Sequence, residues 1–221
     1  MTQTLILGAS GGIGHALAAA CTDRGETVTG LSRSGDGLDL TDERSVAEHL
    51  GRLEGPFDRI LVATGALEID GVAPEKTIKG LSQDAMLAQF TLNAVGPALV
   101  LAQAHRLLPR EGRSIFAVLS ARVGSIGDNR IGGWISYRAA KAAVNQIVHT
   151  SAIELGRTHK EAICVALHPG TVATAFTEKY LGRHPAVAPE EAAQNLLSVM
   201  DGLTATETGG FFDWAGTEVP W

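Results

Sequence analysis

The stretch TLILGASGGIG at residues 4–14 decides the fold, because a short apolar run passes directly into spaced glycines and then into an Ala-rich segment from His15. Gly8, Gly12 and Gly14 allow a tight turn, admit a phosphate against bare backbone and let a helix pack closely on a strand. The first N–H groups of such a helix carry a partial positive charge. The stretch therefore predicts a strand, a phosphate-binding turn and a helix, with an ordinary strand-to-helix turn as the alternative.

The rest of the chain repeats this alternation of apolar runs and helical segments. Predicted strands lie at 4–7, 27–31, 59–63, 114–119, 162–167 and 210–213, and a further one ends before Asp39. Predicted helices lie between them at 14–23, 42–53, 82–108, 136–155 and 189–200. This order implies right-handed crossovers and a parallel sheet covered on both faces. We predict one doubly wound (Rossmann) α/β domain over residues 1–221, with about seven strands.

Composition excludes several classes of protein. Of 221 residues, 45% are hydrophobic and 19% charged, which is typical of a globular chain rather than a disordered one. The net charge of −6 gives no footprint for nucleic acid or an anionic membrane. The two cysteines, Cys21 and Cys164, are too few and too scattered for a disulfide framework or a metal site. We expect a cytoplasmic protein without metal.

The apolar stretch Leu5–Cys21 is not expected to be an export signal, since glycines interrupt it and no Lys or Arg precedes Arg24. The apolar stretch Leu92–Ala104 contains Asn93, Gly96 and Pro97, and no other stretch has the roughly 18 uninterrupted apolar residues of a membrane helix. We therefore expect no membrane partner.

The residues after the second predicted strand bear on the choice of cofactor. In dinucleotide folds an acid there holds the ribose 2′-hydroxyl of NAD, whereas a cation accommodates the 2′-phosphate of NADP. Here the strand is followed by Ser32 and Arg33. Ser32 does not repel a phosphate, and Arg33 can pair with one through two parallel N–H groups. We expect NADP(H), with NAD(H) as the alternative; a solvated loop arginine would favour neither.

Tyr137 and Lys141 form a candidate catalytic pair. They are four residues apart in a segment of helical period, so they share one helix face. A neighbouring cation stabilises phenolate and lowers the pKa of a tyrosine from about 10 toward neutrality, which would let Tyr137 exchange protons. A surface Tyr and Lys one turn apart is a common coincidence, so the pair needs support from other residues.

The G-x-x-x-G-x-G spacing of the first turn resembles that of the short-chain dehydrogenase/reductases, and the resemblance runs from Thr4 to about Gly216. Tyr137 and Lys141 match the family's catalytic pair. Their family roles would be proton exchange by Tyr137, and tuning of Tyr137 and binding of the cofactor ribose by Lys141.

Two further residues complete the family's catalytic set. Ser120, at the end of a predicted strand, matches the serine that steadies the substrate oxygen; Ser125 is the competing candidate. Asn93 matches the asparagine that holds a water between the lysine and solvent, although it could instead be a hydrogen-bonded core amide.

The resemblance also implies a set of cofactor contacts. Asp39 would touch the adenine, Thr174 the carboxamide of the nicotinamide, and His168 is expected to be structural. A segment Ala63-Thr64-Gly65 replaces the family's Asn-Asn-Ala, so backbone contacts there should survive without the asparagine side chains. The full expected set is Gly8, Ser10, Gly12, Ile13, Gly14, Ser32, Arg33, Asp39, Leu40, Ala63, Thr64, Gly65, Tyr137, Lys141, Pro169, Gly170, Val172 and Thr174.

The segments 124–134 and 211–221 look most like those of bacterial C-factor proteins and sniffer-type carbonyl reductases. The resemblance implies an NADP(H)-dependent oxidoreductase acting on a small carbonyl or alcohol, and a homodimer or homotetramer built through the helices carrying Asn93 and Tyr137. The alternative is a C-factor-like signalling protein that binds a dinucleotide with little turnover. The span Ala175–Val187, expected over the substrate, contains no legible motif. Phe211, Phe212 and Trp214 are expected in the core or an interface, and Trp221 against a neighbouring subunit.

Overall fold

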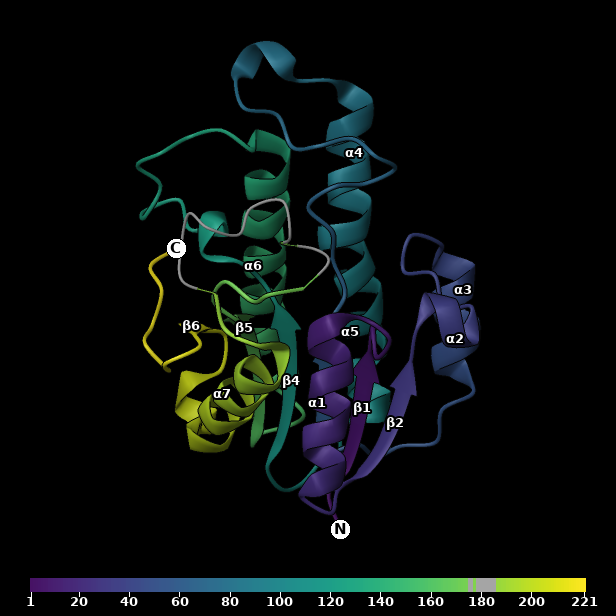
Figure 1. Ribbon diagram of the computed structural model, residues 1–221. Helices are drawn as coiled ribbons and strands as arrows, with labels where there is room; N and C mark the ends of the chain where they lie inside the picture. The colour runs from purple at the N-terminus through teal and green to yellow at the C-terminus, as the bar shows by residue number, and fades with distance from the viewer. Residues whose placement is uncertain (175–176, 178–185) are drawn as a thin grey trace.

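Six parallel strands form one sheet in the order β2-β1-β3-β4-β5-β6 in the computed structural model, which describes residues 1–174, 177 and 186–221 (Figure 1). The strands are β1 (Gln3–Leu7), β2 (Thr27–Leu31), β3 (Arg59–Val62), β4 (Ser114–Leu119), β5 (Ala162–His168) and β6 (Phe211–Asp213). The helices are α1 (Gly12–Asp23), α2 (Arg33–Asp36), α3 (Glu43–Gly51), α4 (Gln83–Phe90), α5 (Gly96–Leu107), α6 (Ile135–Leu155) and α7 (Pro189–Gly202). Shorter helical turns are η1 (Ile78–Gly80), the π-helical η2 (Thr91–Val95), η3 (Arg122–Gly124) and η5 (Ala205–Glu207).

The strand order reverses at β1, which lies between β2 and β3. Thr4 of β1 is level with Val28 on one side and with Arg59 on the other, and all strand pairs are parallel. The carboxyl ends of all the strands therefore meet at one edge of the sheet. Ligands of such sheets bind outside that edge, near the reversal.

The expected strand before Asp39 is absent from the described residues, so the sheet has one strand fewer than predicted. After α2 the chain turns at Gly37 (φ +80°), and the backbone N–H groups of Leu38 and Asp39 donate to Ser32 O and Ser45 Oγ instead of to another strand. Leu38 and Leu40 are still buried. The apolar residues that suggested a strand are therefore packed in the core without pairing to another strand.

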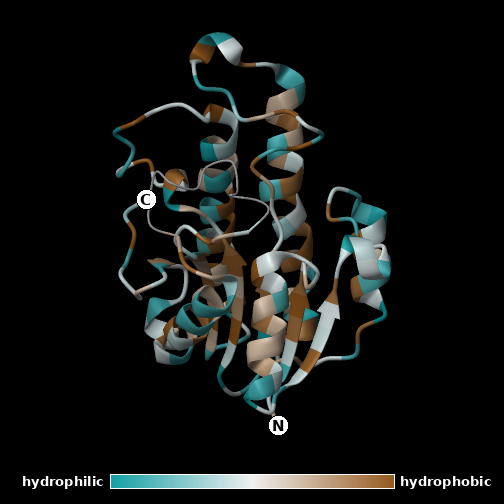
Figure 2. Ribbon diagram, viewed as in Figure 1, coloured by the Kyte–Doolittle hydropathy of each residue, from teal (hydrophilic) through white to brown (hydrophobic). Residues whose placement is uncertain are grey.

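Alternate residues of each strand face two hydrophobic layers. Leu5 and Leu7 face the layer under α3, α5 and α6, whereas Ile6 faces α1 and α7. Because both faces are covered, β1, β3, β4 and β5 are buried at nearly every position, whereas the edge strand β2 has no fully buried residue. Figure 2 shows hydrophobic colour on the inner strands and a paler β2, while hydrophilic residues gather on the outer helix faces and loops.

The helical stretch from α4 through η2 to α5 is long and apolar. The most apolar 18-residue window within Gln83–Leu107 has a mean hydropathy of 1.5, which by length and composition alone would suffice to cross a membrane. Val100, Ala104 and Leu107 are fully buried in the layer under the sheet, and the stretch packs beside α6. In this fold one face of the stretch packs into the core, and 39% of its most apolar window is buried.

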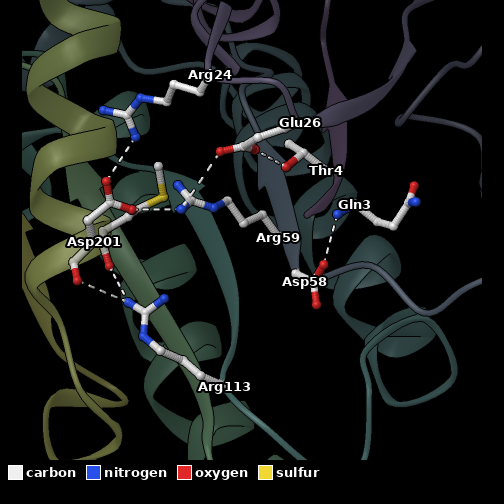
Figure 3. A network of polar contacts seen from close by, with 9 residues as sticks. Gln3, Thr4, Arg24, Glu26, Asp58, Arg59, Arg113 and Asp201 are labelled. Carbon is white, nitrogen blue, oxygen red and sulfur yellow. Dashed lines mark hydrogen bonds and ion pairs between the residues drawn. The ribbon is translucent and has the colours of Figure 1, made fainter. Parts of the chain in front are cut away.

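A polar network joins the amino-terminal edge of the sheet to α7, at the edge away from the glycine turn (Figure 3). Arg59 of β3 lies 2.6 Å from Asp201 of α7, and Arg24 lies 2.8 Å from the same carboxylate. Glu26 is 3.8 Å from Arg59. Arg113, just before β4, donates to the carbonyls of Met200 and Leu203, and so satisfies the last groups of α7.

Candidate active site

The glycine turn after β1 is packed so closely that side chains would not fit. Gly8 has φ +92°, and a Cβ on Gly14 would lie 2.1 Å from Gly8 O. A Cβ on Gly12, the first residue of α1, would lie 2.6 Å from a methyl carbon of Thr174. No described side chain caps α1, so its first N–H groups are available to a ligand. This bare, uncapped cradle fits the pyrophosphate of a dinucleotide.

A cavity of about 310 Å³ opens beside this turn at the carboxyl ends of the strands. Its walls come from the turns after β1, β3, β4 and β5 and from α6. The lining residues are Gly11, Gly12, Ile13, Ala63, Thr64, Gly65, Leu119, Ser120, Ala121, Tyr137, Lys141, His168, Pro169, Gly170, Val172, Thr174 and Thr177.

The cavity brings together twelve of the residues predicted from the sequence. Those outside its lining are Gly8, Ser10, Gly14, Ser32, Arg33, Asp39, Leu40 and Asn93. Most of the span 175–187 expected over the substrate lies outside the described residues. Gly11, Leu119, Ala121, His168 and Thr177 line the cavity without having been proposed as ligand contacts.

Tyr137 and Lys141 lie on one buried face of α6. They are 5% and 3% exposed, and Lys141 Nζ lies 5.8 Å from the centre of the Tyr137 ring. The ammonium donates to Leu119 O at 2.9 Å, which ties α6 to the end of β4. The side chains of Tyr137 and Lys141 are thus held at the cavity wall by the core of the protein.

Burial shifts both groups toward their neutral forms. It raises the pKa of the Tyr137 phenol above its ordinary value and lowers the pKa of the Lys141 ammonium to about 8. The pKa of Tyr137 is thus shifted in the direction opposite to the sequence-based expectation that Lys141 lowers it, because desolvation by burial determines the shift. Tyr137 is protonated here and can donate a proton.

Ser120 and Ser125 have different surroundings. Ser120 lines the cavity, and its Oγ donates to Asn145 Oδ1 at 2.6 Å. Ser125 Oγ instead donates to Pro220 O and accepts from Asp128 N at 3.0 Å, so it holds the C-terminal segment against the loop after η3. Ser120 is therefore the serine in the wall that carries Tyr137 and Lys141.

Asn93 lies in the π-helical turn η2 and binds the loop after β3. Its Oδ1 accepts from Ala66 N at 3.1 Å, and its Nδ2 donates to Ala66 O at 2.9 Å and to Gln89 Oε1 at 2.8 Å. A Cβ on Gly65 (φ +147°) would lie 2.8 Å from Asn93 Oδ1 and 3.4 Å from Lys141 Nζ. Asn93 thus fixes the backbone that runs beside Lys141, and its side chain lies behind the cavity wall.

The loop after β2 carries the residues expected at the adenosine end. Ser32 Oγ accepts from Gly35 N at 3.0 Å as the cap of α2, and Ser10 Oγ accepts from Ser34 Oγ at 2.9 Å across the two loops. Arg33 is exposed beside them. Ser34, which the sequence analysis did not select, joins the glycine turn to this loop.

Asp39 and Leu40 follow on the same side. Hydrogen bonds from the Thr41 hydroxyl and backbone lower the pKa of the Asp39 carboxyl, so it is ionised. Leu40 is buried, and its side chain packs where a Cβ on Gly96 would meet it at 2.9 Å. Leu40 therefore offers a ligand its backbone, since its side chain belongs to the core.

His168 ends β5 at the cavity wall. Burial, with the nearby Arg122 cation, lowers the pKa of His168 to about 4, so the ring is neutral near pH 7. Its Nδ1 has no hydrogen-bond partner among the described residues.

Glu75 positions the start of α6 and was not selected from the sequence. Its Oε1 accepts from Ser136 N at 2.7 Å and Ser136 Oγ at 2.5 Å, and its carbonyl accepts from Trp134 N at 2.6 Å. Burial acts to raise the pKa of the Glu75 carboxyl, but the bonds from Ser136 outweigh it and the pKa is lowered. A carboxylate at a helix N-terminus is favourable, yet nothing in the sequence pattern pairs residues 61 positions apart.

Comparisons with known proteins agree with this geometry. A family model described as Enoyl-(Acyl carrier protein) reductase matches residues 8–201. A 1-hydroxy-2-glutathionyl-2-methyl-3-butene dehydrogenase of Rhodococcus sp. (strain AD45) is 33% identical over the full length of both chains. The C-signal protein of Myxococcus xanthus is 36% identical over 62% of this chain and 78% of its own length.

Solved structures show the same fold. A short-chain dehydrogenase/reductase from Burkholderia multivorans with bound NADP is 25% identical, with a TM-score of 0.80 over 100% of this chain and 99% of its own. The carbonyl reductase Sniffer of D. melanogaster, at 20% identity, has a TM-score of 0.80 over the whole of both chains. The match over residues 8–201, the full-length relative and the cavity beside the glycine turn lead to one conclusion: the chain belongs to the short-chain dehydrogenase/reductase family.

Proposed function

We propose that this protein is an NADP(H)-dependent oxidoreductase that transfers hydride between the nicotinamide and the carbonyl or alcohol carbon of a small substrate. One observation carries the proposal: Ser120, Tyr137 and Lys141 line a single cavity that adjoins the bare glycine turn. Two hydroxyls that can hydrogen-bond an oxygen, next to a cradle for a dinucleotide, form the arrangement that carbonyl reduction requires.

The side chains have separable roles in this reaction. The bound nicotinamide supplies the hydride for reduction or accepts it in oxidation. Ser120 Oγ and Tyr137 Oη donate hydrogen bonds to the substrate oxygen, whose negative charge grows as the carbon gains hydride. Fixed donors of this type contribute roughly 3–4 kcal/mol each to stabilising the transition state. The new O–H bond takes its proton from Tyr137, and in alcohol oxidation the proton returns to it.

Lys141 contributes positive charge behind this pair. Its ammonium is held by Leu119 O and lies beneath the Tyr137 ring, so it stabilises the phenolate that remains after proton transfer. The same ammonium can donate to the ribose of the cofactor. Because burial lowers its pKa to about 8, this charge is present near neutral pH and is lost in alkaline solution.

Preference for NADP(H) follows from the residues after β2. Arg33 is exposed next to the Ser10–Ser34 contact, where it can pair with a 2′-phosphate. The similar structure from Burkholderia multivorans contains NADP, which supports the same choice. Arg33→Ala should weaken NADPH binding and leave NADH binding unchanged; an equal loss for both would assign Arg33 no role at the 2′-position.

The proposed activity can be tested with the purified chain and a panel of aldehydes, ketones and quinones. NADPH absorbance should fall only when a carbonyl compound is present. Tyr137→Phe should bind NADPH as the parent does, measured by quenching of tryptophan fluorescence, and should lose turnover. If this variant still consumed NADPH at the parental rate, the mechanism would be wrong.

The C-signal match supports a second candidate, a signalling protein that binds the dinucleotide with little turnover. The same panel separates the two. NADPH binding without consumption by any carbonyl compound would favour signalling, whereas carbonyl-dependent consumption lost in Tyr137→Phe favours the enzyme.

We further propose that the protein is a homo-oligomer built through the helices carrying Asn93 and Tyr137. Leu87 and Val95 on the first helical stretch and Ile153 on α6 are 56%, 46% and 58% exposed, so both helices present apolar side chains that a second copy would cover. Val95→Asp should lower the mass measured by light scattering, whereas Val72→Asp, at an exposed loop residue outside these helices, should not. Equal masses for Val95→Asp and the parent would exclude this interface.

A further inference from the structure

Asn145 is a buried amide on α6 that the proposed mechanism does not use. It is 2% exposed and lies one turn beyond Lys141 and two beyond Tyr137, so the three side chains share one helix face. Asn145 Oδ1 accepts the hydroxyl proton of Ser120, with 2.6 Å between the two oxygens. Asn145 therefore contacts Ser120, which directly follows β4, whereas Tyr137 and Lys141 lie on the same helix as Asn145.

The other end of this amide has no partner. Asn145 Nδ2 is fully buried and makes no hydrogen bond among the described residues. Buried amide N–H groups are nearly always bonded, because leaving one unpaired loses the bonds that water would supply. An unpaired Nδ2 one atom away from a bonded Oδ1 needs an explanation.

The chemistry of Ser120 supplies one. A serine hydroxyl has one proton and two lone pairs. While that proton lies on Asn145 Oδ1, Ser120 cannot donate it to a substrate oxygen. Once the Ser120 hydroxyl donates its proton to the substrate oxygen, its lone pairs face Asn145 and can accept a hydrogen bond from an N–H group. A half-turn of the amide exchanges Oδ1 and Nδ2, which have nearly the same size and reach, and brings Nδ2 to Ser120 Oγ.

We propose that Asn145 is a positioning residue that sets the direction of the Ser120 hydroxyl. Its carbonyl accepts the Ser120 proton before substrate binds, and its amide N–H donates to Ser120 Oγ when that proton is given to the substrate oxygen. Donation to Oγ also polarises the hydroxyl and strengthens the bond it makes to the growing negative charge. The inference rests on the proposed carbonyl reduction.

A purely structural amide would act differently in a double-mutant cycle. Asn145→Leu keeps the size of the side chain and removes both hydrogen-bonding atoms, and Ser120→Ala removes the hydroxyl. If Asn145 acts through Ser120, Asn145→Leu should lower kcat by about tenfold or more in the parent, without exceeding the roughly 10²–10³-fold loss expected for removal of a transition-state donor. In the Ser120→Ala background the same change should alter kcat by less than about twofold, the scatter of independent mutations.

Three measurements keep a folding defect apart from this effect. NADPH affinity by fluorescence quenching should match the parent, KM should change less than kcat, and thermal unfolding with and without NADPH should show a folded, cofactor-binding protein. Val148→Ala serves as the matched control. It loosens the same helix three residues further on, without touching Ser120, and should leave kcat near the parental value.

Asn145→Asp gives an independent readout through pH. An ionised carboxylate only accepts, so it would keep the Ser120 proton away from the substrate; a protonated carboxyl can donate to Ser120 Oγ again. The ratio of kcat for Asn145→Asp to kcat for the parent should therefore rise as the pH falls, while the same ratio for Asn145→Leu stays constant.

The outcomes separate this inference from the function on which it rests. A parent chain that consumes no NADPH with any carbonyl compound defeats the proposed function. An active parent defeats the inference alone if Asn145→Leu retains parental kcat, or if it lowers kcat equally with and without the Ser120 hydroxyl. A pH-independent Asn145→Asp ratio also overturns it.

Discussion

The single variant Gly14→Ala tests both the packing of the glycine turn and its role in binding the cofactor. The added methyl would lie 2.1 Å from Gly8 O and 2.8 Å from the Gly8 carbonyl carbon. Contacts with backbone atoms cannot be relieved by turning a side chain. The start of α1 must move away from the turn by about 1 Å to reach ordinary contact distance, although α1 is also packed against α7 and the sheet.

The size of the effect follows from two opposing terms. Overpacking of this type destabilises by about 1–3 kcal/mol, and the helix preference of Ala over Gly offsets roughly 0.5–1 kcal/mol of it. The expected net loss of about 1–2 kcal/mol corresponds to a fall in Tm of roughly 2–8 °C for a chain of this size. Displacing N–H groups that face a phosphate removes at least one bond to a charged group, worth about 1.5–3 kcal/mol, so NADPH should bind roughly 10–100-fold more weakly.

Gly51→Ala is the matched control, because Gly51 is also a helical glycine and nothing lies within 4 Å of its added methyl. It should be as stable as the parent or more stable, with unchanged NADPH affinity. Urea unfolding and titration of tryptophan fluorescence with NADPH measure both quantities. If Gly14→Ala matched Gly51→Ala in stability and affinity, the turn would be neither tightly packed nor the seat of the cofactor.

Three other perturbations have defined outcomes. The kcat/KM for carbonyl reduction should fall as the pH rises through about 8, because burial lowers the pKa of Lys141 to about 8 and the ammonium loses its proton there. A pH profile that stays flat well above that pH would contradict the role of the ammonium. Asp201→Asn should lower the free energy of unfolding by about 1–2 kcal/mol, since it removes the negative charge that lies 2.6 Å from the mostly buried Arg59. NADPH affinity should not change at the opposite edge of the sheet, and a weakened affinity in a fully stable protein would refute this assignment. Glu75→Ala should cost about 1 kcal/mol of stability by uncapping α6, seen in thermal unfolding, whereas an unchanged Tm would show that Ser136 finds another acceptor.

The sequence predicted the sheet well where strands are buried on both faces. The runs at 4–7, 114–119 and 162–167 coincide closely with buried strands, because continuous apolar runs suit a sheet covered by helices on both sides. The expected strand before Asp39 failed because Leu38 and Leu40 satisfy the same apolar pattern by packing into the core from an irregular segment. Burial alone does not specify backbone pairing.

Most residues of the site could be predicted from the sequence, but their burial and its effect on their pKa values could not. Spacing placed Tyr137 and Lys141 on one helix face, but spacing does not report desolvation, which reverses the expected shift in the pKa of Tyr137. Asn145 carried a weak signal, a polar residue four positions after Lys141 in an apolar helix face. Trp221 stacks on Phe211 and meets His149 edge-on within its own chain, and it is still 43% exposed, so its expected contact with another subunit stays a prediction.

Desolvation also bears on the direction in which this site works best. Near pH 7, burial keeps the Tyr137 phenol protonated, while Lys141, with a pKa of about 8, still holds most of its charge. Reduction of a carbonyl needs a proton donor at Tyr137 and positive charge to receive the resulting phenolate, and both are present in that range. Oxidation of an alcohol needs phenolate at the outset, which the buried site disfavours until the pH rises, and at that pH Lys141 has lost the charge that would stabilise it. In the proposed reaction, the same burial that holds the two side chains in place is therefore expected to favour the reductive direction at neutral pH.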